Sequence, residues 1–249
     1  MSIYLSENFF ILYLPLIVFF YSVFQSLIGV GLLLFGTPTL LLLGMDFGEA
    51  LTVLLPCSIT INLCQLCNGL PRNRKSIYRI MGVTLPMIFV GLVFSLQDLD
   101  TYWISIIVGI TLVALGVIRI SIKASSWLNH MVASYQIPYL AFMGLLHGLS
   151  NLGGGLLVAY ASTLASEKNE IRSIVALGYF LFAATQLIVL FFSQPHFFKI
   201  QYFYLPFVSL FAYLGGNYLF SRLNSIQFGK LVTFLILFYG LVTIGNVFG

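Results

Sequence analysis

The stretch His147-Gly148-Leu149-Ser150-Asn151-Leu152-Gly153-Gly154-Gly155-Leu156-Leu157 decides the fold, because an uninterrupted apolar helix cannot run through it. Three consecutive glycines, each about 1 kcal/mol less favourable than alanine in a helix interior, follow Ser150 and Asn151 within a long apolar segment. We expect the helix to break there. Inside a bilayer, a break is tolerated only where its backbone polar groups are buried in protein or line a wet cavity. The half-helix that follows would aim its positive N-terminus at this cavity, which favours a small anion.

A second stretch of the same kind, Gln25-Ser26-Leu27-Ile28-Gly29-Val30-Gly31, lies 124 positions earlier. At this offset Ser26 aligns with Ser150, Gly29 with Gly153 and Gly31 with Gly155, and Leu-Leu follows both Gly31 and Gly155. We interpret the two stretches as two halves of one site.

The composition is that of a membrane protein. The chain has 249 residues, of which 60% are hydrophobic and 7% are charged, whereas about 25% charged is usual in soluble domains. Each span needs roughly 20 apolar residues, so we expect about eight spans or broken spans and no soluble domain. The net charge of +4 comes mostly from short loops and indicates topology, not nucleic-acid binding. The lipid bilayer is therefore the expected surrounding, and a bacterial inner or plasma membrane the expected location.

Apolar runs and turns divide the chain into two related halves, 1–125 and 126–249, joined within the linker 121–137. The first half has a broken segment with arms at 9–28 and 32–43, then spans at 50–69, 77–96 and 102–120. The second half has a broken segment at 138–165, then spans at 172–192, 201–220 and 227–247. Asn62 and Gln186 share the offset of 124, and Pro86 and Pro206 each lie in the third segment of a half. Such matched positions indicate an internal duplication.

The distribution of basic residues favours inverted halves. If each broken segment enters and leaves the membrane on one side, only Lys199 of the 11 Lys and Arg residues faces outside. The cytoplasmic set is then Arg72, Arg74, Lys75, Arg79, Arg119, Lys123, Lys168, Arg172, Arg222 and Lys230. If the broken segments cross fully, the halves are parallel and Lys168, Arg172, Arg222 and Lys230 face outside in place of Lys199. We expect an all-α polytopic membrane protein with inverted repeats, each a broken or re-entrant helix followed by three transmembrane helices.

With its paired glycine-rich breaks, each followed by Leu-Leu, the chain resembles the TauE/SafE sulfite exporter family of anion permeases. The resemblance covers nearly the whole length and extends to the polar turn after each broken segment and to the two prolines. Gly29-Val30-Gly31 is a departure, because the family more often has a longer glycine run there. The resemblance implies transport of small anions, often sulfur-containing, such as sulfite, sulfonates or thiosulfate.

Substrate-binding candidates come from both halves. They are Gln25, Ser26, Gly29, Gly31, Asn62, His147, Ser150, Asn151, Gly153, Gly154, Gly155, Thr185 and Gln186. Asn62 and Gln186 carry carboxamides near the middle of apolar spans, where polar groups are costly unless paired or facing a cavity. The alternative for the Ser-Asn-Gly stretch is close helix packing alone, since small residues are common at membrane helix interfaces.

Several other residues carry two interpretations. His147 titrates in a range that would couple proton and anion movement, but a neutral structural role is the alternative. Asp46 and Glu49 precede a span, where we interpret them as helix-capping residues. Cys57, Cys64 and Cys67 are interpreted as small buried side chains, not as a metal or redox site. Tyrosines are interpreted mostly as lipid-facing and interfacial anchors.

We therefore expect a secondary transporter of a small anion, coupled to a proton or to sodium. An anion channel would have a similar sequence, and saturable, gradient-coupled flux would separate the two. An intramembrane enzyme is a further alternative, because His147 and Ser150 stand three residues apart. No second intramembrane His or paired Asp completes a hydrolytic site, so no catalytic residue is assigned. We predict no metal site and no cofactor.

Overall fold

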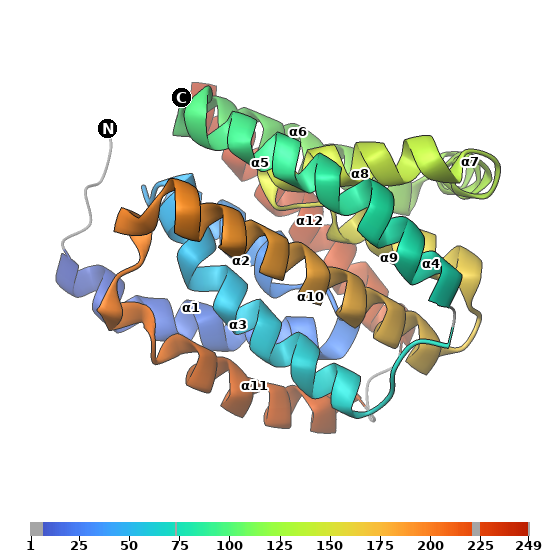
Figure 1. Ribbon diagram of the computed structural model, residues 1–249, viewed down its shortest axis with the longest axis horizontal. Helices are drawn as coiled ribbons and strands as arrows, with labels where there is room; N and C mark the ends of the chain where they lie inside the picture. Colours follow the sequence, from blue (N-terminus) through green and yellow to red (C-terminus); the bar gives the residue numbers. More distant parts are fainter. Residues whose placement is uncertain (1–6, 73, 221–224, 249) are drawn as a thin grey trace.

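The computed structural model describes residues 7–72, 74–220 and 225–248, and the regular structure of these residues is all helical (Figure 1). The first half contains α1 (Glu7–Ile28), α2 (Leu32–Leu42), α3 (Phe47–Cys67), α4 (Arg74–Arg79), a π-helical turn (Ile80–Thr84), α5 (Leu85–Gln97) and α6 (Thr101–Ile120). The second half contains α8 (Gln136–Ser150), α9 (Gly154–Leu164), α10 (Lys168–Ser193), 3₁₀ turns at Pro195–Phe197 and Ile200–Tyr202, α11 (Leu205–Phe220) and α12 (Ser225–Phe248). Within these residues, four helical segments are long and apolar enough to cross a membrane. They are α3 (Phe47–Cys67), α6 (Thr101–Ile120), most of α10 (Asn169–Ser193), and the continuous stretch Ile77–Gln97 that joins the end of α4, the π-helical turn and α5. The predicted all-α architecture is thus confirmed, and the four long apolar helices agree with a membrane protein.

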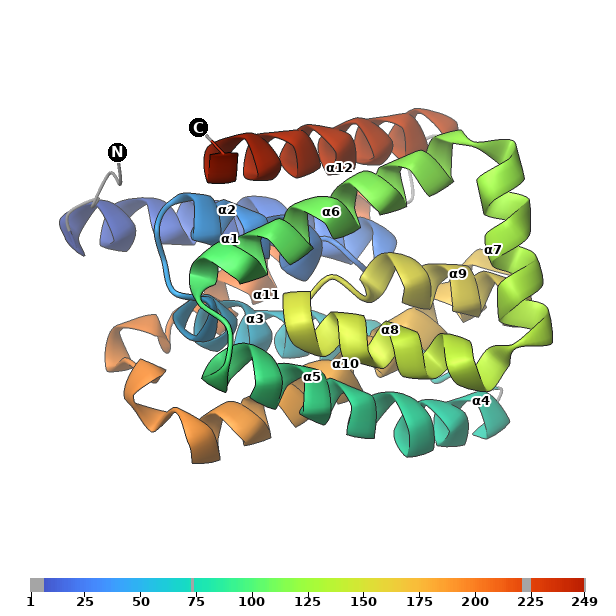
Figure 2. The same ribbon diagram turned by 90° about the horizontal axis from the view of Figure 1, so that it is seen from above.

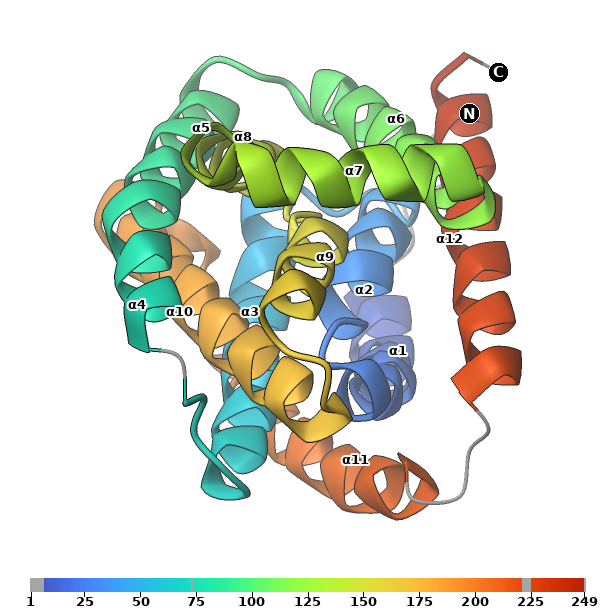
Figure 3. The same ribbon diagram turned by 90° about the vertical axis from the view of Figure 1, so that its right-hand side faces the viewer.

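The linker between the halves is mostly helical. Ser121 is the N-cap of its helix α7 (Ile122–Ser134), and the Ser121 hydroxyl accepts a hydrogen bond from the Ala124 N–H at 3.2 Å. Figure 3 shows α7 crossing one end of the bundle, with Trp127 59% exposed. We call this end the α7 end. The opposite end holds the connection between α10 and α11, which contains Lys199, and we call it the Lys199 end (Figure 1). The α3–α4 and α9–α10 connections also lie at the α7 end, whereas α1 begins and α12 ends at the Lys199 end (Figures 1 and 2).

Both predicted breaks are present, and each forms the turn of a helical hairpin, α1–α2 in the first half and α8–α9 in the second. α1 runs from the Lys199 end and α2 turns back toward it, whereas α8 runs from the α7 end and α9 turns back toward that end (Figure 2). The first turn uses Gly29 with φ +85°, a backbone conformation that favours glycine. The second turns at Asn151 with φ +62°, not at the glycine run. Gly154 and Gly155 are instead the first two residues of α9, so the first turn of this helix begins with two residues that have no side chain.

The most extensive helix contacts join one half to the other. α5 packs on α8, α1 on α11, α3 on α10, and α6 on α12. The α5–α8 contact brings Gly91 and Gly148 together so closely that a side chain at Gly148 would meet the backbone of α5. Small residues permit such close packing, so Gly148, just before the Ser-Asn-Gly stretch, has a packing role.

The cysteines follow the prediction only in part. All three are free thiols; Cys57 is buried, Cys64 is half-buried and Cys67 is exposed. The interpretation as buried side chains is therefore correct for Cys57 and wrong for Cys67. Cys67 is the last residue of α3, where the helix reaches the α7 end and leaves the packed interior.

Candidate functional site

The second break is held by side chains of the helix that precedes it. The Gly153 N–H donates to His147 Nδ1 at 3.0 Å, and the Leu152 N–H donates to the Ser150 hydroxyl at 3.3 Å. The Asn151 N–H donates to the His147 carbonyl at 2.7 Å. His147 and Ser150 thus accept hydrogen bonds from two of the N–H groups exposed by the break. These predicted site residues therefore have a structural role in the turn.

Buried polar groups without a protein partner gather next to this break. His147 packs against α10, with ring centroids 4.9 Å from Phe182 and 5.8 Å from Tyr179. Gln186 is one turn after Phe182 on the same face of α10 and lies beside the imidazole. His147 Nε2, the Tyr179 hydroxyl and both polar atoms of Gln186 are buried without a hydrogen-bond partner in the described protein. We call His147, Tyr179 and Gln186 the second-break cluster.

The glycine run lies against this cluster. A Cβ at Gly154 would overlap the Tyr179 hydroxyl, so the first turn of α9 touches the tyrosine directly. Gly155, the next residue, faces a different helix, and a Cβ there would lie 3.0 Å from Leu115 on α6. The N-terminus of α9, with its N–H groups and positive end of the helix dipole, is therefore next to unpaired polar side chains.

The first break is organised differently. Gln25 Nε2 donates to the Ser58 hydroxyl at 2.9 Å and to Asn62 Oδ1 at 3.1 Å, and Asn62 Nδ2 donates to the Ser58 hydroxyl at 3.3 Å. Gln65 Nε2 donates to the Gln25 carbonyl at 3.1 Å. We call these four residues the first-break network. It brings the predicted site residues Gln25 and Asn62 together and pairs Gln25 Nε2 and both polar atoms of Asn62 with protein. Gln25 Oε1 and Gln65 Oε1 are buried without a partner in the described protein.

The remaining predicted site residues near the first break are packed into the backbone. The Ser26 hydroxyl donates to the Val23 carbonyl at 2.7 Å, and the Ser26 carbonyl accepts from Arg172 Nη2 at 2.8 Å. A Cβ at Gly31 would lie 2.5 Å from the Gln25 nitrogen, so only glycine fits this close approach. Gly29, whose turn is described above, faces Val175 of α10.

One hydrogen bond links the second break directly to the first broken segment. Asn151 Nδ2 donates to the Thr37 hydroxyl of α2 at 2.9 Å, which leaves Asn151 Oδ1 buried without a partner. Thr185 does not join either group, because its hydroxyl donates to the Leu181 carbonyl at 2.9 Å and it is only half-buried. The two breaks are neighbours, yet their polar side chains form two separate groups.

Sequence reasoning missed two tyrosines of this region. Tyr179 and Tyr160 are fully buried, and both hydroxyls are without a partner in the described protein. The interpretation of tyrosines as interfacial anchors does not hold for these two. The spacing of seven residues between Tyr179 and Gln186 places both on one helix face and is a signal that would have found Tyr179.

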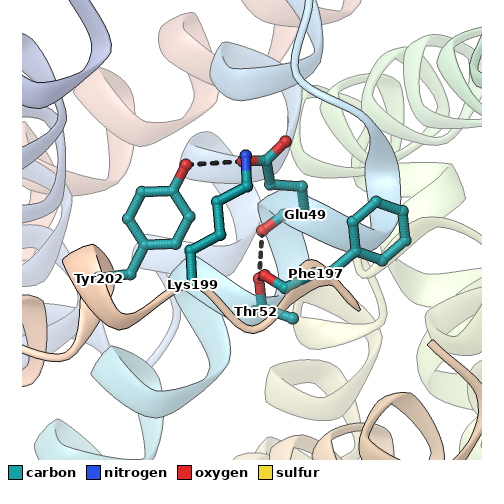
Figure 4. Close-up of polar contacts among 5 residues, drawn as sticks. All are labelled: Glu49, Thr52, Phe197, Lys199 and Tyr202. Carbon is teal, nitrogen blue, oxygen red and sulfur yellow. Dashed lines mark hydrogen bonds and ion pairs between the residues drawn. The ribbon is translucent and has the colours of Figure 1, made fainter. Parts of the chain in front are cut away.

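Polar contacts join the two halves at the Lys199 end (Figure 4). Lys199 Nζ lies 2.5 Å from Glu49 Oε1, and the Tyr202 hydroxyl donates to the same oxygen at 2.6 Å. Thr52 donates to the Phe197 carbonyl at 3.1 Å. The capping interpretation is correct for position, because Asp46 is the N-cap of α3 and Glu49 lies in its first turn. It is wrong for the contacts, because Asp46 makes no side-chain capping bond and Glu49 binds the second half.

Together, the long apolar helices, the two broken hairpins and the buried polar groups at the breaks define a multi-pass membrane protein. A sequence model of a protein family described as "Sulfite exporter TauE/SafE" matches residues 14–243. The chain therefore belongs to this family, whose members are membrane transporters, not enzymes, and export sulfur-containing anions. A search of curated proteins found no match, and a search of solved structures found none either.

Proposed function

We propose that this protein is a secondary permease that moves a small sulfur-containing oxyanion or organosulfonate, such as sulfite, across the cell membrane. We further propose that the anion binds at the second break, between the second-break cluster and the first turn of α9. The observation that carries this proposal is the hydrogen bond from the Gly153 N–H to His147 Nδ1, because it determines the chemistry of the whole cluster.

A neutral imidazole carries one proton, and a nitrogen that accepts a hydrogen bond cannot also be the protonated one. Since His147 Nδ1 accepts from Gly153, the proton is on Nε2, which becomes a donor inside the cluster. The Tyr179 hydroxyl and the Gln186 NH₂ group are donors as well. Neutral donors together with a helix N-terminus match the needs of an oxyanion and avoid the cost of a buried cation.

This arrangement also favours one of the two roles left open for His147. Protonating Nδ1 would place its hydrogen against the Gly153 N–H and break the bond that holds the turn. We therefore assign His147 the neutral role of anchoring the turn and donating to the anion. The coupling ion, a proton or sodium, would then act elsewhere.

We also propose that the two halves are inverted repeats, with the α7 end in the cytoplasm. The opposite directions of the two hairpins support this (Figure 2). The helix pairs support it as well. α1 corresponds to α8 and α5 to α11 in the two halves, so the α1–α11 contact and the α8–α5 contact are the same contact made twice. The Arg72 N–H donates to Glu170 Oε1 at 2.8 Å, which keeps the basic α3–α4 loop beside the start of α10. Arg222 lies outside the described residues.

The orientation is tested by labelling from outside intact cells. Cys67 is an exposed native thiol near the α3–α4 loop and serves as one reporter, with Cys57 and Cys64 replaced by alanine. A second protein lacks all three native cysteines and carries Asn169→Cys at the start of α10. We expect both to be protected from a membrane-impermeant thiol reagent. Labelling of position 169 but not 67 would show that the halves are parallel.

The function is tested with purified protein in liposomes. We expect saturable sulfite uptake that is accelerated by sulfite inside the vesicles, as for a carrier, with taurine, sulfoacetate and thiosulfate tested as competitors. Flux that neither saturates nor responds to internal anion would indicate the alternative, a channel. If none of these anions is transported or bound, the proposed function is wrong.

The site is tested with two matched Tyr→Phe variants. Tyr179→Phe removes a donor from the cluster, and we expect anion affinity to fall on the order of tenfold, since hydrogen bonds to charged groups are the stronger ones. Tyr139→Phe removes a hydroxyl that donates to the Leu156 carbonyl at 2.7 Å, so it should lower thermal stability and leave affinity unchanged. Wild-type affinity in Tyr179→Phe would place the site elsewhere.

A further inference from the structure

A cavity of about 260 Å³ touches the broken segments of both halves. It lies between α6, α7, α9 and α12, and its lining includes Val30, Gly155, Ala159, Ser162, Arg119 and Asn129. We call it the α9 cavity. Val30 comes from the first break and Gly155 from the first turn of α9, so the deep end of the cavity reaches the glycine run on a different face of α9 from the one that contacts Tyr179.

Exposure changes along this cavity in one direction. Val30 at the deep end is 4% exposed, Gly155 and Ala159 are half-buried, and Ser162, Arg119 and Asn129 are exposed. Gly155, Ala159 and Ser162 are four and three residues apart on α9, which runs toward the α7 end (Figure 2). One face of α9 therefore lines the cavity from the break to a mouth at the α7 end.

The charge of the lining has one sign. Arg119, in the last turn of α6, is the one charged side chain among the lining residues, all of which are described, and its Nε donates to the Thr233 hydroxyl at 3.0 Å. A second cavity at the α7 end, of about 310 Å³, is lined by two arginines, Arg72 and Arg172, and by two glutamates, Glu167 and Glu170. An anion at the α7 end is thus attracted to the α9 cavity, whereas the carboxylates of the second cavity oppose it.

We propose that the α9 cavity is the route by which the anion passes between the α7 end and the second break, and that Arg119 at its mouth selects for negative charge. The proposal rests on the proposed function, because it gives that site its access path. Only the first turn of α9 separates the deep end of the cavity from the second-break cluster, since Gly154 faces the cluster and Gly155 faces the cavity. Movement of that one turn would join them.

The route is tested by thiol chemistry that needs no transport. In a protein with Cys57, Cys64 and Cys67 replaced by alanine, Ala159→Cys places a thiol inside the cavity and Ser166→Cys places one on the exposed loop after α9. Each is treated with an anionic sulfonatoethyl and a cationic trimethylammonium methanethiosulfonate. We expect the anionic-to-cationic rate ratio at position 159 to exceed that at 166 by roughly tenfold, the lower range for electrostatic focusing in a cleft.

Arg119→Gln should bring the ratio at position 159 to that at 166, and Arg119→Lys should keep most of it. Lys123→Gln removes an exposed cation of α7 that does not line the cavity, so it is the matched control and should leave the ratio unchanged. Salt at about 1 M, where the Debye length is roughly 3 Å, should reduce the preference. An unreactive Ala159→Cys, or a ratio that Arg119→Gln does not alter, would overturn the proposal.

Transport separates this inference from the function itself. If the wild type transports sulfite, Arg119→Gln should raise the KM for anion on the α7 side about tenfold, whereas Lys123→Gln should not. A wild-type KM in Arg119→Gln overturns the route while the function stands. If the wild type transports none of the anions tested, the proposed function fails, and the thiol ratio still decides whether the cavity selects anions.

Discussion

The two breaks occupy aligned positions in the sequence, yet their polar side chains are paired with protein to different extents. At the first break, Gln25, Ser58 and Asn62 bond to one another. Only the carboxamide oxygens of Gln25 and Gln65 are left without a partner there, among the described residues. At the second break, the Tyr179 hydroxyl and both polar atoms of Gln186 have no partner in the described protein, and neither has His147 Nε2. Residues at the offset of 124 explain the difference, because Phe182 stands where the first half has Ser58, and Tyr179 where it has Leu55.

The hydroxyl of Ser58 is the centre of the first-break network, since both carboxamides donate to it. Phe182 supplies no such acceptor, so Gln186 keeps its hydrogen-bonding capacity, and Tyr179 adds a further donor. Buried polar groups stabilise a fold when they are paired and cost free energy when they are not. The difference between the halves therefore suggests a division of labour, with polarity at the first break serving the fold and polarity at the second serving the ligand.

The largest effects should come from removing the aligned carboxamides. Gln186→Leu should fold normally and lose anion affinity by about 10-fold to 100-fold, since a Leu of similar volume cannot donate. Asn62→Leu should instead lower the free energy of unfolding by about 1–3 kcal/mol, because it takes partners from Gln25 and Ser58. Thermal unfolding and anion binding measured on both variants test this. Equal losses of affinity would mean that both carboxamides bind the anion, as the sequence alone predicts.

A smaller contrast should follow from adding one methyl group to each break. A Cβ at Gly31 meets backbone, 2.5 Å from the Gln25 nitrogen, so Gly31→Ala should destabilise the fold by about 1–3 kcal/mol. A Cβ at Gly154 meets the end of the Tyr179 side chain, which can rotate away. Gly154→Ala should therefore retain stability and bind the anion more weakly.

The double variant Gly154→Ala/Tyr179→Phe is the control for that mechanism. If the methyl group acts by displacing the tyrosine hydroxyl, the double variant should bind no more weakly than Tyr179→Phe alone, because contacting residues are not additive. Additive losses in the binding assay would show that the backbone of Gly154 contributes directly.

The membrane fold and the two breaks were predictable because they follow from composition and from glycine chemistry. The helix pairing between halves was not, since it depends on which faces meet once the hairpins have formed. The exact turn was also missed, because Asn151 adopts the left-handed conformation that the glycine run was expected to supply. The Gly153 bond to His147 explains this: it fixes the chain two residues after Asn151, so the turn is made before the last glycines.

The candidate site was predictable in its residue types but not in their roles. Gln25, Asn62, His147 and Gln186 were recognised as unusual polar groups in apolar segments. Whether each is paired depends on neighbours from distant helices, as for Gln25 of α1 and Ser58 of α3. Arg119 was treated as a topology signal because its position at the end of a span explains a charge without any ligand. Only the cavity beside it indicates a second role.

The smallest effect should come from Ser58→Ala, which tests whether the first-break network is structural throughout. The variant removes the acceptor of Gln25 and Asn62, but the direct bond from Gln25 Nε2 to Asn62 Oδ1 at 3.1 Å remains, so neither carboxamide is left without a partner. We expect a loss of about 1 kcal/mol in the free energy of unfolding, the net value of a typical buried hydrogen bond, and unchanged anion affinity. A network that served the ligand would respond in the opposite sense, because carboxamides freed from Ser58 would bind the anion more tightly. Increased affinity in Ser58→Ala would therefore contradict the contrast between the two halves, whereas reduced stability at wild-type affinity would support it.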